Sequence, residues 1–136
     1  MHYILNGQLG ERAGVVGKLE EFCRANALPR GVGNAADVAL EEHLTNVLTY
    51  GYEAGAPHRI SVSLKTEAGW LCVEVADDGK PFDPLAVSPV DTSLPLEEKP
   101  IGGLGVHLMR QLMDELSYAR ENGKNVLRMR KRIAAD

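Results

Sequence analysis

The chain has 136 residues, of which 44% are hydrophobic and 25% are charged, as in an ordinary globular protein with one domain and a substantial core. Its formal net charge of −4 argues against a general attraction to nucleic acid or to an anionic membrane. No apolar run approaches the roughly 18 residues that cross a bilayer, and the N-terminus lacks the layout of an export signal. We therefore expect a protein that binds neither nucleic acid nor membrane.

The cysteines and the basic C-terminal segment indicate the redox compartment and whether the chain carries a nucleic-acid-binding patch. Cys23 and Cys72 are the only cysteines, and without a CxxC spacing or an export signal they predict reduced thiols in a cytoplasmic protein. Arginine and lysine gather over residues 128–132, but apolar residues alternate with them. That alternation predicts a strand with one solvated face and not a nucleic-acid patch.

The first half of the chain predicts one strand and two helices. A short strand is expected over residues 3–9, and apolar residues at helical spacing predict a helix over 11–27. Pro29 and Gly31 interrupt the pattern, and a second helix is expected over about 33–52. Its candidate core positions are Val38, Leu40, Leu44, Val47 and Leu48.

The middle of the chain predicts a hairpin followed by a long loop. Residues 59–66 alternate between apolar and polar side chains, and a turn over 67–69 leads to a returning strand over 70–76. From 82 to 100 the sequence is rich in proline and has no periodicity. Because so long a loop inside a compact domain is usually functional or disordered, we interpret it as a lid over a ligand.

The last third predicts a helix and a second hairpin. A helix is expected after Gly105 and to about Leu116, with Val106, Met109, Leu112 and Met113 facing inward. Strands over 117–120 and 125–132 then pair across the strong turn signal Asn122-Gly123. Hairpins mixed with helices favour an α+β fold in two layers, with helices on one face of a sheet.

The first candidate site block is Glu42-His43-Leu44-Thr45-Asn46 on the second helix. Four residues apart, Glu42 and Asn46 project from the same helix face. A carboxylate there can accept a proton, and an amide oxygen suits Mg²⁺. The alternative is an exposed helix face without a function. His43 has no partner at ligand spacing, so we do not expect a zinc site.

The second block is Asp77-Asp78-Gly79-Lys80-Pro81-Phe82-Asp83, at the end of a predicted strand. A buried Asp77 can accept a hydrogen bond from the exocyclic amine of adenine and reject the carbonyl of guanine. Gly79 leaves room for a flat ring beside the backbone. The alternative is a polar hairpin turn, because Asp-Gly is a common turn dipeptide.

The third block is Gly102-Gly103-Leu104-Gly105, directly before a predicted helix. Exposed backbone N–H groups at a helix N-terminus bind phosphates. A Walker A loop is excluded because no Gly-Lys-Ser/Thr sequence follows, and the dinucleotide fingerprint is excluded because no βαβ unit surrounds the glycines. Lys80 and Lys99 are possible phosphate contacts, although such lysines are usually solvated.

Together and in this order, the three blocks resemble the N, G1 and G2 boxes of the GHKL ATPases and kinases. The boxes span about 38–52, 77–84 and 101–108 of a single domain over 1–136, with an ATP lid over about 83–101. The continuation Pro81-Phe82-Asp83-Pro84 is similar to the anti-sigma-factor serine/threonine kinase branch and differs from sensor histidine kinases. The resemblance implies a Bergerat-type two-layer sandwich with a mixed, largely antiparallel sheet.

The resemblance also assigns roles. It implies that Glu42 is the general base, that Asn46 is the metal ligand, and that Glu41, at a position where the family usually has a smaller residue, is not the base. The nucleotide contacts that it implies, together with the two lysines, are Asn46, Asp77, Gly79, Lys80, Pro81, Phe82, Lys99, Gly102, Gly103, Leu104, Gly105 and Val106.

The function that the resemblance implies is a bacterial serine/threonine protein kinase that uses ATP and Mg²⁺. Its substrate would be an antagonist protein with a STAS domain, and it would sequester a sigma factor or a similar regulator. The resemblance is also compatible with a homodimer. No sensor domain or phosphoacceptor helix precedes the ATP site, which argues against a complete histidine kinase. Two alternatives stay open: a partner-switching module that binds ATP without kinase activity, and a simple GHKL ATPase.

Overall fold

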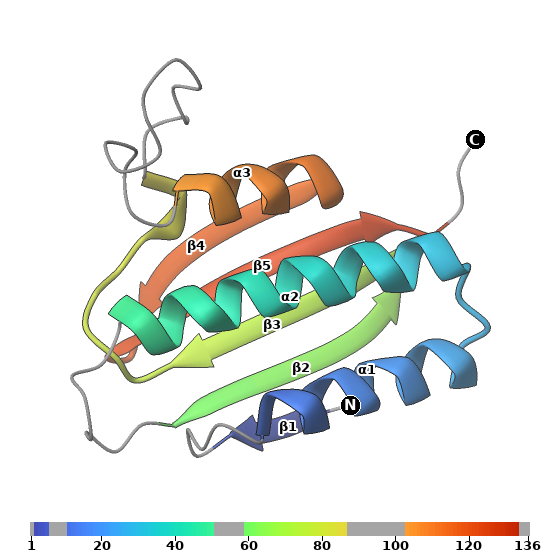
Figure 1. The fold of residues 1–136 in the computed structure, drawn as a ribbon, viewed down its shortest axis with the longest axis horizontal. Coiled ribbons are helices and arrows are strands. Elements are labelled where there is room, and N and C mark those ends of the chain that lie inside the picture. Colours follow the sequence, from blue (N-terminus) through green and yellow to red (C-terminus); the bar gives the residue numbers. More distant parts are fainter. Residues whose placement is uncertain (1, 6–10, 51–58, 87–102, 134–136) are drawn as a thin grey trace.

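The computed structural model describes residues 2–5, 11–50, 59–86 and 103–133 (Figure 1). The elements in chain order are β1 (His2–Leu5), α1 (Glu11–Ala25), α2 (Arg30–Tyr50), β2 (Ile60–Glu67), β3 (Trp70–Asp77), the short 3-10 helix η1 (Pro84–Ala86), α3 (Gly103–Leu112), β4 (Glu115–Glu121) and β5 (Lys124–Arg132).

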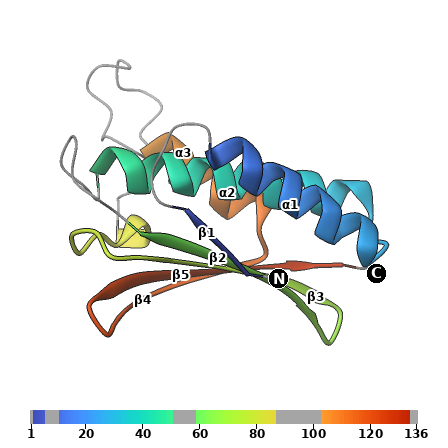
Figure 2. The same cartoon turned by 90° about the horizontal axis from the view of Figure 1, so that it is seen from below.

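The strands form one five-stranded sheet in the order β1-β2-β3-β5-β4, and the three α-helices cover one of its faces (Figure 2). This arrangement confirms the predicted two-layer α+β fold. Every pairing among the described strands is antiparallel, so the expected mixed sheet was wrong in that detail. The reason is that β5 lies between β3 and β4, the two strands that the α3 crossover connects.

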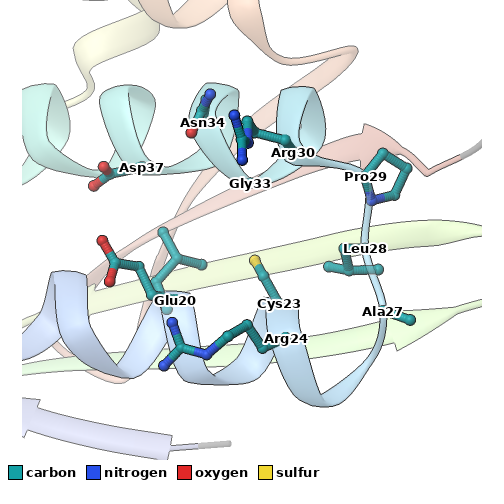
Figure 3. A pocket seen from close by; sticks show the side chains of 11 residues that line it. Glu20, Cys23, Arg24, Ala27, Leu28, Pro29, Arg30, Gly33, Asn34 and Asp37 are labelled. Atoms are coloured by element: carbon teal, nitrogen blue, oxygen red, sulfur yellow. The ribbon is translucent and has the colours of Figure 1, made fainter.

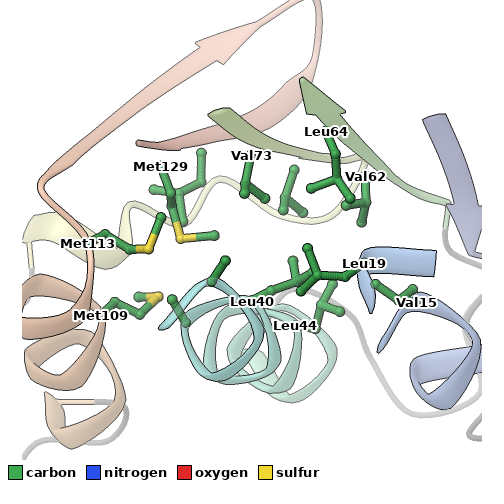
Figure 4. Packing of buried hydrophobic residues seen from close by; sticks show 14 of the residues in the cluster. Val15, Leu19, Leu40, Leu44, Val62, Leu64, Val73, Met109, Met113 and Met129 are labelled. Atoms are coloured by element: carbon green, nitrogen blue, oxygen red, sulfur yellow. The ribbon is translucent and has the colours of Figure 1, made fainter. Parts of the chain in front are cut away.

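The core lies between the helices and the inner face of the sheet (Figure 4). Apolar side chains of all three helices meet apolar side chains of β2, β3 and β5, among them Val15, Leu19, Leu40, Leu44, Val62, Leu64, Val73, Met109, Met113 and Met129. Four of the five core positions predicted on the second helix are buried or half-buried. Val38 is the exception, because it is 37% exposed.

The second helix begins three residues earlier than predicted. The carbonyl of Pro29 accepts hydrogen bonds from Val32 N at 3.1 Å and Gly33 N at 3.2 Å. Proline tolerates a helix start because its fixed φ fits the first turn and its missing N–H would have no partner there. Pro29 therefore starts α2 instead of breaking it, and Gly31 lies inside the helix.

The third helix is shifted toward the N-terminus relative to the prediction. It includes Gly103–Gly105 and ends at Leu112, whereas we expected it to begin after the glycines and to reach Leu116. Met113 N still bonds to Met109 O at 3.0 Å, but Asp114 N already bonds to Arg130 O at 2.9 Å. The chain thus changes to sheet pairing at once, and Leu116 belongs to β4.

Both predicted hairpins are present. Ala68 and Gly69 turn between β2 and β3 with φ of 51° and 87°, and Asn122 and Gly123 turn between β4 and β5 with φ of 52° and 76°. Positive φ at both central residues matches the right-handed twist of the flanking strands.

The outer face of the sheet carries the arginines of β5. Arg128 pairs with Glu74 at 3.1 Å and with Glu121 at 3.3 Å, and the guanidinium of Arg130 lies 4.2 Å from the centre of the Trp70 ring. These contacts confirm the predicted strand with a solvated face. Among the described residues, no helix is long and apolar enough to span a membrane.

Alanine substitutions at two glycines should change the free energy of unfolding in opposite directions. Gly123→Ala should lower the free energy of unfolding by about 1 kcal/mol, because alanine is strained at φ of 76°. Gly17→Ala should raise it by about 0.5–1 kcal/mol, because Gly17 lies inside α1 with no atom within 4 Å of an added Cβ. Urea unfolding measures both, and a stabilising Gly123→Ala would contradict the turn geometry.

Candidate functional site

Three blocks predicted from the sequence meet at one end of the sheet. The tip of β3, the start of β5, the C-terminal half of α2 and the N-terminus of α3 lie at this end (Figure 1). α2 and α3 pack side by side over the sheet. The fold therefore brings Asp77, Asn46 and Gly103 to the same end although they are far apart in sequence.

Asp77 is the buried carboxylate of this end, with only 2% of its surface exposed. Its Oδ1 accepts hydrogen bonds from Gly79 N and from Asn125 Nδ2, both at 2.9 Å. Burial raises the pKa of Asp77, while these two hydrogen bonds act in the opposite direction. Because both bonds go to Oδ1, the other oxygen, Oδ2, is the one suited to accept a hydrogen bond from a ligand amine.

The neighbouring Asp78 has a different task. It is exposed, and its Oδ1 accepts a hydrogen bond from Arg59 N at 3.0 Å. Asp78 N in turn donates to Arg59 O at 3.3 Å. Asp78 thus joins the start of β2 to the end of β3, which leaves Asp77 as the carboxylate that faces the interior.

Asn125 holds the segment that follows β3. Its Nδ2 donates to Lys80 O at 2.7 Å as well as to Asp77, and its Oδ1 accepts from Phe82 N at 3.1 Å and from the hydroxyl of Tyr118 at 2.5 Å. Asn125 is 5% exposed, so these bonds satisfy the whole amide in a buried place. The amide thereby fixes Asp77 and the backbone from Lys80 to Phe82 as one unit.

Three further hydrogen bonds shape this segment. Arg120 Nη1 donates to Gly79 O at 2.9 Å. Asp83 Oδ1 accepts from Leu85 N at 2.8 Å and so caps η1. The carbonyl of Leu85 then accepts from Arg110 Nη2 of α3 at 2.9 Å. The strand-end segment is therefore tied to both β4 and α3.

α2 supplies the second set of candidate side chains. Glu42 is half-buried, whereas Glu41 is exposed. Asn46 is 5% exposed, and its Nδ2 has no hydrogen-bond partner. His43 is also buried, and burial lowers its pKa to about 4. The imidazole is therefore neutral at neutral pH.

The glycine block occupies the first turn of α3. The backbone of Gly103–Gly105 is helical there, and Val106 is buried in the core. The first N–H groups of a helix have no partner inside it and are available to an anion. Gly102 and Lys99 lie outside the described residues. Lys80 and Pro81 are exposed and Phe82 is half-buried on the strand-end segment.

Sequence reasoning missed three residues of the site: Tyr118, Arg120 and Asn125. Asn125 carried one signal, since asparagine is depleted in strands and here directly follows a hairpin turn into a predicted strand. Tyr118 and Arg120 carried none, because their contacts depend on the β4–β5 register.

A hollow of about 410 Å³ lies between α1 and α2, apart from these residues (Figure 3). Glu20 of α1 and Asp37 of α2 face each other across it (Figure 3). Burial raises the pKa of Asp37, and the charges of Glu41 and Glu20 add to the rise. None of the candidate nucleotide residues lines this hollow, so it is not part of the site.

The donor set fits magnesium better than a softer metal. The described residues contain no group of three or more His, Cys, Asp or Glu side chains that could hold a metal ion. Mg²⁺ needs no such group, because it keeps several waters and binds one or two protein oxygens together with substrate phosphates. Asn46 would offer one such oxygen, Oδ1, while its Nδ2 has no hydrogen-bond partner.

Comparison with known proteins identifies the family. The model of the histidine kinase-like ATPase domain matches residues 8–131. The serine/threonine-protein kinase BtrW of Bordetella bronchiseptica is 31% identical over 64% of this chain and 61% of its own length. The serine-protein kinase RsbW of Bacillus thuringiensis is 32% identical over 66% of this chain and 58% of its own length. The aligned region thus spans about three fifths of these relatives.

Solved structures support the fold. The RsbU and RsbW domains of Rv1364c from Mycobacterium tuberculosis superpose with a TM-score of 0.68 at 14% identity, over 100% of this chain and 33% of that one. The histidine kinase domain of a blue-light activated kinase from Erythrobacter litoralis gives a TM-score of 0.57 at 20% identity, over 77% of this chain and 46% of that one. At these identities the likeness concerns the fold alone.

The Asn125 amide can be tested by truncation. Asn125→Ala should lower the free energy of unfolding by about 3 kcal/mol, because it leaves several buried polar groups without partners. The matched control is Asn26→Ala, which removes one exposed hydrogen bond to Phe22 O and should cost less than about 1 kcal/mol. Equal losses in urea unfolding would contradict the structural role given to Asn125.

Proposed function

Because the chain belongs to the histidine kinase-like ATPase domain family, we propose that it binds Mg-ATP and phosphorylates serine or threonine of a partner protein. One observation carries the proposal: half-buried Glu42 and buried Asn46 share a face of α2, at the same end of the sheet as buried Asp77. The names of the relatives BtrW and RsbW support a serine kinase.

We propose the following nucleotide contacts. Oδ2 of Asp77 accepts a hydrogen bond from the adenine amine, and the close backbone at Gly79 leaves room for the ring. Phe82 and Pro81 border the base, and the N–H groups of Gly103, Leu104, Gly105 and Val106 hold phosphate oxygens together with the lysines. Gly102 and Lys99 stay candidates from the sequence.

The proposed transfer needs few groups. Asn46 Oδ1 would hold the Mg²⁺ of Mg-ATP, and the bound nucleotide would supply the γ-phosphoryl group. Glu42 orients the partner hydroxyl and takes its proton as the hydroxyl oxygen bonds to the γ-phosphorus. The bond between that phosphorus and the β,γ-bridging oxygen breaks, and ADP leaves. Positioning and charge neutralisation supply most of the rate enhancement in such transfers.

The proposed partner of this reaction is a STAS-domain antagonist, and a sigma factor or a similar regulator is the proposed partner for sequestration. The resemblance of the three sequence blocks to the anti-sigma-factor kinase branch supports these partners. A homodimer is proposed on the same ground. The competing functions are a binding module without transfer and a simple hydrolase. The Glu42/Asn46 pair favours chemistry over binding alone.

Labelled ATP separates these functions. With a co-encoded STAS protein, the kinase should place phosphate on serine or threonine, a hydrolase should release free phosphate alone, and a binding module should do neither.

Glu42→Gln should slow transfer at least about 100-fold, because it removes the proton acceptor, and should leave ATP affinity within about twofold. Glu41→Gln, its exposed neighbour, is the control and should transfer normally. Transfer by Glu42→Gln at the wild-type rate would remove Glu42 from the mechanism.

Asp77→Asn tests the base reader. Since Oδ1 already accepts two hydrogen bonds, the new amide nitrogen replaces Oδ2 and meets the adenine amine, donor against donor. ATP affinity should fall about tenfold or more, measured with a fluorescent ATP analogue and with GTP as competitor. Asp78→Asn is the matched control and should bind ATP normally. Unchanged affinity in Asp77→Asn would refute the assignment.

A further inference from the structure

Four buried side-chain atoms on three residues of α2 lack a hydrogen-bond partner in the described part of the chain. They belong to Asp37, His43 and Asn46. Asp37 borders the hollow between α1 and α2, where solvent is close. His43 and Asn46 are 3% and 5% exposed, so a partnerless polar group there costs about 1–3 kcal/mol.

Asn125, the other buried asparagine among the described residues, provides a comparison, because all hydrogen-bonding positions of its amide have partners. Asn125 Nδ2 donates twice and Oδ1 accepts twice. By contrast, Asn46 Nδ2 and both ring nitrogens of His43 have no partner. Unsatisfied buried groups in an otherwise satisfied fold call for an explanation in function.

His43 and Asn46, the two buried residues in the described part of the chain that have side-chain atoms without hydrogen-bond partners, are close in the helix and have complementary hydrogen-bonding groups. Three residues apart on a helix, His43 and Asn46 lie on adjacent positions of one face. Burial keeps the imidazole neutral, so one of its nitrogens accepts a hydrogen bond. The amide nitrogen of Asn46 can only donate. Each residue therefore offers what the other lacks.

The pairing would decide which way the Asn46 amide faces. An asparagine amide presents its oxygen or its nitrogen depending on its partners, and a magnesium ligand must present the oxygen. We propose that His43 is a positioning residue that accepts a hydrogen bond from Asn46 Nδ2 when Mg²⁺ and nucleotide are bound, and so directs Asn46 Oδ1 toward the metal. The inference rests on the metal role that the proposed function gives to Asn46.

Groups that orient a metal ligand from behind typically change metal affinity 10- to 100-fold when they are removed. His43 would act in this way on Asn46. A histidine that only fills the core would instead affect stability and leave the metal dependence of nucleotide binding unchanged. The two roles are therefore separable by measurement.

The test measures the affinity of the full chain for a fluorescent, non-hydrolysable ATP analogue with and without Mg²⁺. His43→Leu keeps an apolar volume but removes both nitrogens. It should reduce the gain in affinity from Mg²⁺ about tenfold, leave the Mg²⁺-free affinity within about twofold, and not lower stability in urea. His43→Gln, which keeps an acceptor, should recover most of the gain. His43→Met is the second apolar variant in case His43→Leu fails to fold.

Two comparisons make the outcome decisive. Leu40→Met, a buried change one turn earlier on α2, should leave the Mg²⁺ gain unchanged. The double variant His43→Leu/Asn46→Ala should lose no more of the gain than Asn46→Ala alone, because His43 acts through Asn46.

A Mg²⁺ gain of wild-type size in His43→Leu, when Asn46→Ala has lost it, would overturn the positioning role and leave the proposed function intact. An equal loss with and without Mg²⁺ would also overturn it. If Asn46→Ala keeps the gain, the metal assignment in the proposed function fails first, and the role of His43 fails with it.

Discussion

Asn125 joins parts of the chain that have no local reason to meet. It donates to Asp77, 48 residues earlier in the sequence, and the β3–β5 register places the two residues opposite each other. The same amide holds the backbone of Lys80 and Phe82 and the hydroxyl of Tyr118. Asn125 therefore helps to fix both the buried carboxylate and the segment after β3, and its own position depends on correct strand pairing.

α2 serves the core and the candidate site at once. Leu40 and Leu44 are fully buried among the helices and the sheet, while half-buried Glu42 and buried Asn46 lie in the helix half at the site end. A helix can do both because its 3.6-residue period separates faces within one turn. The packing that fixes Leu44 thereby fixes the direction of its neighbours, so the candidate site needs no loop to position these two groups.

The sequence correctly predicted the elements whose structure is decided by residues close together in the chain. The alternating pattern of β2 and β3 and the Asn122-Gly123 turn each have a mechanism within a few residues, and the structure shows both hairpins. Pro29 misled because its effect depends on whether a helix precedes or follows it. Val38 misled because apolar character alone does not say which residue of a helical stripe faces the sheet.

The same distinction applies to the candidate site: residues within local motifs were predicted, and residues that act through long-range contacts were not. The blocks around Asn46, Asp77 and Gly103 carried motifs, and their elements do gather at one end of the sheet. Asn125 and Arg120 act through hydrogen bonds that cross 48 and 41 residues. No spacing rule reaches that far, because such contacts arise from strand register and not from local sequence.

The strand order has a consequence for how the molecule is made. β5 is the last of the described strands in sequence, yet it lies inside the sheet between β3 and β4. On a ribosome, β3 emerges with one edge unpaired and with Asp77 lacking its amide partner. The β3 edge can pair only after β5, which ends at Arg132, has been synthesised. Until then the open β3 edge presents unpaired N–H and C=O groups that can pair with another chain.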